Sequence, residues 1–162
     1  REKYHIDKNE RLIIIAPSYG KSNLLEICGI ELIKILLEHN YQLILRPHFR
    51  ILKDSKKLID KIEKKFSENK NFVLVRDVIK PKDFHSSICM ITDWSGIGLE
   101  YSFTTKNKVF FIDVSQKIIN SEFGLLSIEP IEKSIRSKIG RVISPRELKL
   151  IPELYGIQHL QI

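Results

Sequence analysis

The sequence predicts an α/β fold in which five parallel strands form a doubly wound sheet in the order 3-2-1-4-5. Short, mostly apolar runs alternate along the chain with longer segments of helical periodicity. Such alternation is typical of parallel strands joined by right-handed helical crossovers. The apolar runs lack a polar residue at every second position, as expected of strands buried on both faces of a sheet.

Five segments have the length and composition of buried strands: 12–16, 41–45, 72–75, 88–92 and 109–112. Apolar residues at helical spacing predict helices at 22–38, 54–68 and 95–104, a helical turn at 81–85, and helices near 130–138 and 144–150. In this Rossmann-like arrangement the order of the strands reverses between strands one and four, although all strands run the same way. Ligands of such sheets bind near that point, at the carboxyl ends of the strands. We therefore expect a site in the loops after strands one, two and four.

Length and composition indicate one globular domain, with 162 residues, 43% hydrophobic and 29% charged. No apolar run approaches the roughly 18 to 20 residues of a membrane span. Because the chain begins at Arg1 rather than at a methionine, we expect a piece of a longer protein. Residues 1–11 are then a ragged lead-in from a missing N-terminal domain, 12–155 the folded domain and 156–162 a C-terminal tail.

The net charge of +7 suggests acidic partners. Much of the excess lies on one predicted helix, in Lys53, Lys56, Lys57, Lys61, Lys64 and Lys65. This pattern favours a solvated helix face, and contact with an anionic membrane surface is left open. No aromatic residues interleave with these lysines as a nucleic-acid surface would require, so we expect no nucleic-acid partner.

The two cysteines, Cys28 and Cys89, lie in apolar stretches without the spacing of metal ligands. We expect buried free thiols that are not bonded to each other, as in a protein of the reducing cytoplasm. Neither a metal nor a cofactor is expected.

The loop after strand one reads Pro17-Ser18-Tyr19-Gly20-Lys21-Ser22. Its Gly-Lys-Ser ending is not a P-loop, because the glycine required five residues before Gly20 is replaced by Ile15. No GxGxxG motif occurs either, which argues against a nicotinamide or flavin site. Two interpretations stay open: a structural turn, or backbone N–H groups of Ser18, Tyr19 and Gly20 that bind phosphate.

The loop after strand two, Arg46-Pro47-His48-Phe49-Arg50, is a compact cationic cluster. Arginine binds phosphate oxygens through its forked guanidinium, and histidine can donate a hydrogen bond or a proton. The alternative is a surface loop with incidental charge. The loop lies beside the point where the strand order reverses, and this place favours a role in ligand binding.

The chain after strand four reads Thr92-Asp93-Trp94-Ser95-Gly96 and then becomes helical. Asp93 or Ser95 can cap that helix. Alternatively, Ser95 and Gly96 can present a hydroxyl and N–H groups to a phosphate at the helix N-terminus. Glu100, on the first turns, is suited to accept hydrogen bonds from ribose hydroxyls. Taken together, the three loops fit a nucleoside diphosphate.

Four segments in order resemble the C-terminal domain of the CDP-glycerol glycerophosphotransferases, the teichoic-acid and capsule polymer enzymes: Ile15-Ala16-Pro17-Ser18, Leu45-Arg46-Pro47-His48, Ile91-Thr92-Asp93-Trp94-Ser95 and Lys108-Val109-Phe110-Phe111-Ile112-Asp113. A weaker echo follows in 128–132 and Arg136. Two departures are Trp94-Ser95-Gly96, where the family commonly has Tyr-Ser-Ser, and Phe49, where a second proline is frequent.

The resemblance implies one half of a two-domain GT-B architecture, the half that holds the CDP-linked donor. It implies catalytic roles at the pyrophosphate for His48 and Arg46, phosphate binding by Ser95, and a loop-fixing role for Asp93. The ribose role of Glu100 follows less directly. The acceptor hydroxyl would attack the donor β-phosphate and displace CMP.

The family's general base lies in its N-terminal domain, and nothing in this chain matches it, since His5 is too close to the start. We therefore expect that the chain alone is inactive. The implied location is cytoplasmic, with contact to the inner face of the plasma membrane left open. Two alternatives remain: the C-terminal domain of a GT-B sugar-nucleotide glycosyltransferase, and a noncatalytic nucleotide-binding module.

Overall fold

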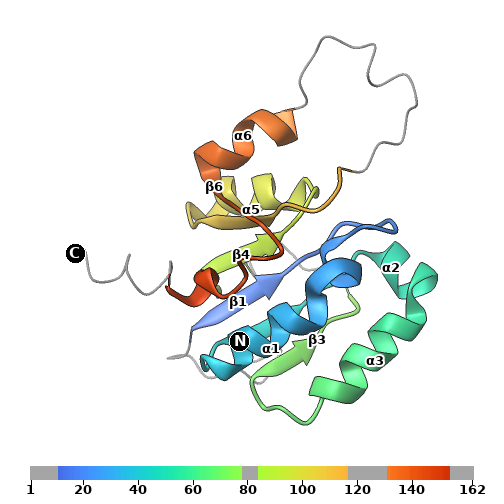
Figure 1. Cartoon of the computed structure of the whole chain (residues 1–162). Coiled ribbons are helices and arrows are strands. Elements are labelled where there is room, and N and C mark those ends of the chain that lie inside the picture. Colours follow the sequence, from blue (N-terminus) through green and yellow to red (C-terminus); the bar gives the residue numbers. More distant parts are fainter. Residues whose placement is uncertain (1–10, 78–83, 117–130, 154–162) are drawn as a thin grey trace.

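A computed structural model of the chain describes residues 11–77, 84–116 and 131–153. Its centre is a sheet of six strands in the order β3-β2-β1-β4-β5-β6 (Figure 1). The strands are β1 (Leu12–Ile15), β2 (Gln42–Leu45), β3 (Phe72–Leu74), β4 (Cys89–Thr92), β5 (Val109–Ile112) and β6 (Gly140–Ile143). Every pairing between neighbours is parallel.

The five predicted strands form, and their order 3-2-1-4-5 is confirmed. The predicted count of five is wrong, because β6 adds a sixth strand beside β5. Since β6 lies at the edge of the sheet, it needs no continuous apolar run: Ile143 is buried, whereas Arg141 and Val142 are exposed. Its first residue must be small, because a Cβ on Gly140 would lie 1.9 Å from the carbonyl oxygen of Val109.

The helical elements are a π-helical turn η2 (Leu25–Gly29) followed by α1 (Ile30–Glu38), then α2 (Phe49–Asp54), α3 (Lys56–Phe66), α5 (Ile97–Thr105) and α6 (Ile131–Ile139). The predicted helix 22–38 thus contains a π-helical turn, and the predicted helix 54–68 is preceded by a separate short helix. The helix predicted at 144–150 is wrong, since residues 145–149 are mainly turns and helical residues begin at 150. Most of the predicted turn at 81–85 lies outside the described residues.

Alternate strand residues point into two cores, one on each face of the sheet. One core contains Ile13, Leu43 and Cys89 and is covered by η2, α1, α2 and α3. The other contains Ile14 and Met90 and is covered by Tyr101 and Ile97 of α5 and by Ile139 at the end of α6, together with Phe84. Figure 1 shows these helices on the two sides of the sheet. The sheet is therefore doubly wound, and its carboxyl edge is left open to the loops.

Both cysteines are buried and free, which confirms that they are not bonded to each other. Burial raises the pKa of the Cys28 thiol to about 11, and it also raises the pKa of Cys89. On α3 the lysines are exposed, while Ile59, Ile62 and Phe66 are buried against the sheet. None of the described helices has the length and apolar character needed to cross a bilayer.

Candidate functional site

The loops after β1, β2 and β4 meet at the carboxyl edge of the sheet, and each pair of loops is linked by a side chain. Asp93 links the end of β4 to the loop after β1. Its Oδ1 accepts a hydrogen bond from the backbone N–H of Ser18 (2.7 Å), and its Oδ2 accepts one from Leu24 (2.8 Å). Asp93 is only 1% exposed. Both carboxylate oxygens are therefore used to hold the loop after β1, rather than the loop of Ser95 or a phosphate.

Aromatic contacts link the loop after β1 to the loop after β2. The ring centroids of Tyr19 and His48 are 4.6 Å apart, and those of His48 and Phe49 are 4.4 Å apart. The guanidinium of Arg50 lies 4.6 Å from the Tyr19 ring centroid, within the range of a cation–π contact. The four side chains form one stack that sets the position of the His48 imidazole.

The hydrogen bonding of His48 indicates which ring nitrogen carries the proton. His48 is the residue before α2, and its Nδ1 accepts a hydrogen bond from the backbone N–H of Arg50 at 3.2 Å. An accepting Nδ1 is unprotonated, so the neutral ring has its proton on Nε2. A neutral His48 can thus act as a hydrogen-bond donor through Nε2.

An electrostatic interaction between Arg46 and Glu100 connects the loop after β2 to α5. The half-buried guanidinium of Arg46 has its pKa lowered by burial, and the carboxylate of Glu100 opposes this shift. The buried Nε of Arg46 has no hydrogen-bond acceptor among the described residues. A buried donor of this kind is costly to leave unpaired.

The N-terminus of α5 is open. Gly96 precedes the helix, and no side chain caps it. The alternative in which Asp93 or Ser95 caps α5 is therefore not observed: the Asp93 oxygens are bound to the other loop, and the Ser95 hydroxyl has no hydrogen-bond partner in the described part of the chain. The N–H groups of Ser95, Gly96 and Ile97 also have no acceptor within those described residues. These free groups form a local anion-binding arrangement.

A Cβ placed on Gly96 would meet no atom within 4 Å. Space for a ligand therefore lies directly beside the open N–H groups of α5. In contrast, a Cβ on Gly98, one turn into the helix, would lie 3.0 Å from both Phe111 and Thr92. The two glycines serve different purposes: Gly98 allows the helix to pack on the sheet, whereas Gly96 borders free space.

The helix after β1 differs, because its first N–H groups are already bound. Asn23 accepts hydrogen bonds from Leu25 (2.8 Å) and Glu26 (3.3 Å) through Oδ1 and donates to the Gly20 carbonyl (2.6 Å) through Nδ2. Sequence analysis missed Asn23, although an asparagine before an apolar helical segment is a known capping signal. Gly20 has a φ of 119°, a conformation that favours glycine. This loop is therefore held rigidly by Asp93 and Asn23.

A second group of residues, to which sequence analysis assigned no role, lies beside Asp93. Arg136 of α6 is 5% exposed, and its guanidinium lies 4.1 Å from the Trp94 ring centroid. Burial lowers the pKa of Arg136, while the charges of Asp113 and Asp93 oppose that shift. The Trp94 indole N–H donates to the Val114 carbonyl at 2.7 Å. Arg136 thus fixes Trp94 and partly balances the buried Asp93 charge.

A cavity of about 150 Å³ lies between these groups, lined by Ser18, Tyr19, Gly20, Trp94, Val114 and neighbouring loop residues. All nine predicted site residues lie at this edge of the sheet: Ser18, Tyr19, Gly20, Arg46, His48, Asp93, Ser95, Gly96 and Glu100. Asp93 faces the protein interior, whereas Gly20, Gly96 and Glu100 are exposed. Within the described ranges, no group of three or more histidine, cysteine or acidic side chains is arranged to hold a metal.

No family model matches the chain, and no curated protein does. Solved structures do resemble it. The UDP-GlcNAc 2-epimerase of Methanocaldococcus jannaschii, solved with UDP-GlcNAc and UDP, aligns over 91% of this chain and 38% of its own, with a TM-score of 0.61 and 12% identity. Another structure of that epimerase aligns over 95% and 40%, with a TM-score of 0.62 and 14% identity.

The E. coli ADP-heptose lipopolysaccharide heptosyltransferase II aligns over 98% of this chain and 49% of its own, with a TM-score of 0.60 and 13% identity. The chain therefore spans less than half of each of these proteins. At such low identity the likeness concerns the fold alone. That fold is the Rossmann-like α/β domain that forms one half of GT-B enzymes.

Proposed function

We propose that this chain is the donor-binding half of a GT-B transferase, which holds the diphosphate of a nucleotide-activated donor at the carboxyl ends of β1, β2 and β4. The observation that carries the proposal is the open N-terminus of α5. Three N–H groups and the Ser95 hydroxyl lack partners in the described residues and face free space at Gly96. The partly buried Arg46 contributes a positive charge near the same helix.

In this proposal the N-terminus of α5 and Ser95 bind phosphate oxygens. His48 donates through Nε2 to the pyrophosphate, and Arg46 stabilises the negative charge that develops on the leaving nucleotide. Asp93 acts indirectly, by holding Ser18 and the loop that carries Tyr19 and Gly20. Glu100 is assigned to the ribose, where its exposed carboxylate can accept hydroxyl hydrogen bonds.

The resemblance to CDP-glycerol glycerophosphotransferases supports a CDP-linked polyol as the donor and a role in teichoic-acid or capsule synthesis. An acceptor hydroxyl would attack the donor β-phosphorus, the bond from that phosphorus to CMP would break, and CMP would leave. The acceptor proton would go to a base outside this chain, in an N-terminal domain. The proposed location is therefore cytoplasmic, at or near the inner face of the membrane.

A sugar nucleotide is the alternative donor, favoured by the fold that the chain shares with an epimerase solved with UDP-GlcNAc and with an ADP-heptose transferase. Equilibrium binding of CDP-glycerol, CDP-ribitol, UDP-GlcNAc and ADP-heptose to the chain separates the two. Tightest binding of a CDP-polyol supports the first donor class, and tightest binding of a sugar nucleotide supports the second.

The site itself is tested by calorimetric titration with CDP and with cytidine. Ser95→Ala and His48→Ala are each expected to weaken CDP binding about five- to tenfold. Cytidine should bind these variants as it binds the unaltered chain, because neither residue is assigned to the nucleoside. Glu100→Ala should weaken both ligands. Ser67→Ala and His85→Ala change exposed residues away from the site and serve as matched controls. Equal CDP affinity in all the serine and histidine variants would place the site elsewhere.

A further inference from the structure

A second, larger pocket lies at the opposite edge of the sheet from the proposed donor site. It has a volume of about 630 Å³ and is lined by the end of α5, the start of β5, the end of α6 and the start of β6. We call it the basic pocket, because Lys106, Lys108, Lys138 and Arg141 line it. The intervening β5 is four residues long, or roughly 13 Å, so the basic pocket is separate from the site at the carboxyl edge.

The charges around the basic pocket are all of one sign. No acidic side chain is among the described residues that line it, and two hydroxyls, Ser102 and Ser137, lie between the cations. Lys106, Lys138 and Arg141 have no ion-pair partner in the part of the chain that the structure describes. A volume of this size is within the range of about 300–1,000 Å³ that is common for small-molecule sites.

Some of these cations compensate the negative ends of helix dipoles, but not all of them do. The C-termini of α5 and α6 both lie at the pocket, and each carries an effective charge of about −0.5. Lys106, just beyond α5, and Lys138, in the last turn of α6, compensate these two ends. The three cations Lys106, Lys138 and Arg141 against roughly one negative unit leave an excess of about two positive charges. Arg141 lies on β6, where no helix end requires a positive charge.

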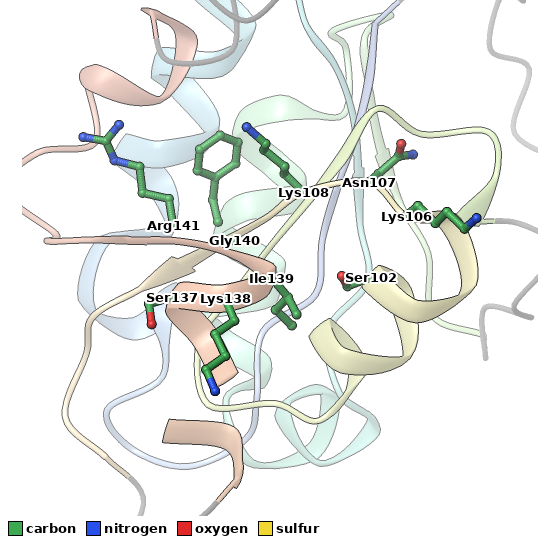
Figure 2. A pocket seen from close by; sticks show the side chains of 10 residues that line it. Ser102, Lys106, Asn107, Lys108, Ser137, Lys138, Ile139, Gly140 and Arg141 are labelled. Atoms are coloured by element: carbon green, nitrogen blue, oxygen red, sulfur yellow. The ribbon is translucent and has the colours of Figure 1, made fainter. Parts of the chain in front are cut away.

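We propose that the basic pocket binds a molecule carrying several phosphate groups. Figure 2 shows the cationic side chains spread around the rim, with Lys106 and Lys138 extending away from each other. This spacing suits several charges better than a single compact anion. Lysine contributes point charges, arginine a fork that matches phosphate oxygens, and the two serines additional hydrogen-bond donors.

The proposal is tested with inorganic tripolyphosphate. Its binding to the 162-residue chain is followed through changes in the amide chemical shifts of the chain in NMR spectra. Saturating CDP is present in one series to occupy the donor site and absent in the other. We expect shifts at 102–108 and 137–141 in both series, and binding that weakens as salt rises. Shifts confined to the loops at 18–20 and 95–97 would overturn the proposal. Failure of CDP to bind would contradict the donor site without affecting this result.

Two triple variants separate the pocket from the overall charge. Lys106→Gln/Lys138→Gln/Arg141→Gln alters the basic pocket, and Lys56→Gln/Lys57→Gln/Lys64→Gln removes the same number of charges from exposed positions of α3. The pocket variant should bind tripolyphosphate about tenfold more weakly, and the α3 variant less than about twofold. Equal weakening in both would show attraction by net charge alone and would overturn the proposal.

Sedimentation with phosphatidylcholine vesicles that contain a bisphosphorylated phosphoinositide then distinguishes the source of the phosphates. If the pocket variant alone loses sedimentation, the ligand is an anionic lipid headgroup. If tripolyphosphate binds in the pocket but the unaltered chain does not sediment, the ligand is a soluble phosphorylated molecule. Circular dichroism of each variant confirms that these exposed substitutions leave the fold intact.

Discussion

The carboxylate of Asp93 and the backbone N–H of Ser18 are joined by a 2.7 Å hydrogen bond between residues 75 positions apart. Together with the bond to Leu24, it ties the end of β4 to the loop after β1. These are the two strands on either side of the point where the strand order reverses. The shape of the proposed donor site therefore depends on a buried charge that is not itself available to a ligand.

Asp93→Asn should destabilise the fold, because an amide retains only one acceptor and turns an NH₂ group toward a backbone N–H. We expect a loss of about 1.5–3 kcal/mol in the free energy of unfolding, the usual value of hydrogen bonds to a charged group. Urea denaturation measures it. Asp60→Asn, at an exposed position of α3, should change stability by less than about 0.5 kcal/mol. Similar values for both variants would contradict the role of Asp93.

Gly96→Ala should separate ligand binding from stability. Gly96 has a φ of −59° and open space around its Cβ position, so alanine is expected to stabilise the chain by about 0.4–1 kcal/mol through reduced freedom of the unfolded state. The added methyl should obstruct a phosphate at the α5 N-terminus and weaken CDP binding about tenfold.

Gly98→Ala is the matched contrast, since its Cβ would lie 3.0 Å from Phe111 and Thr92. It should cost about 1–3 kcal/mol through overpacking. Thermal unfolding and calorimetry report both properties for each glycine variant. Unchanged CDP affinity in Gly96→Ala would show that the free space beside Gly96 is not used by the phosphates.

Arg136→Ala should remove the cation stacked on Trp94 and leave Asp93 with less compensating charge. A loss of about 2 kcal/mol in stability is expected, typical of a desolvated cation–π contact. Trp94 is the one tryptophan in the sequence, so its fluorescence emission reports the environment of the stack directly. Arg146→Ala changes an exposed arginine and should leave both readouts as they are. An unaltered emission spectrum in Arg136→Ala would refute the contact.

The Cys28 thiol should make stability depend on pH in alkaline solution. Its pKa rises from 9.0 to about 11 on folding. Above pH 9 the unfolded chain loses a proton that the folded chain keeps, so stability falls as the pH rises from 9 toward 11. Below pH 9 both states are protonated and this contribution is constant.

Urea denaturation at pH 8 and pH 10 measures the effect. At pH 10 the loss attributable to Cys28 should be on the order of 1 kcal/mol. Cys28→Ala should lack this part of the decrease, while the contribution of Cys89 is the same in both proteins. The same decrease in the chain with and without Cys28 would assign the pH dependence to other groups.

The sequence by itself determined the layout of the sheet. Runs such as Leu12–Ile15 and Val109–Ile112 are apolar on both faces, and they alternate with helical segments, so a parallel sheet covered by helices on both sides buries them fully. Once the order 3-2-1-4-5 follows, the ends of β1, β2 and β4 must meet. The predicted site residues could therefore be brought to one edge without any knowledge of tertiary contacts.

The tertiary structure decided what those residues do. Whether Asp93 caps α5 or holds the loop after β1 depends on which N–H groups lie within reach, and its partners Ser18 and Leu24 are 75 and 69 positions away. The stack of Arg136 on Trp94 and the basic pocket likewise bring together segments that no local pattern relates. The edge strand β6 was missed for a related reason. Only β5 lies beside it, so β6 is only partly buried and its residues carry little apolar signal. Local hydrophobic periodicity reports which segments are buried, whereas the use of a polar side chain depends on donors and acceptors supplied by distant parts of the chain.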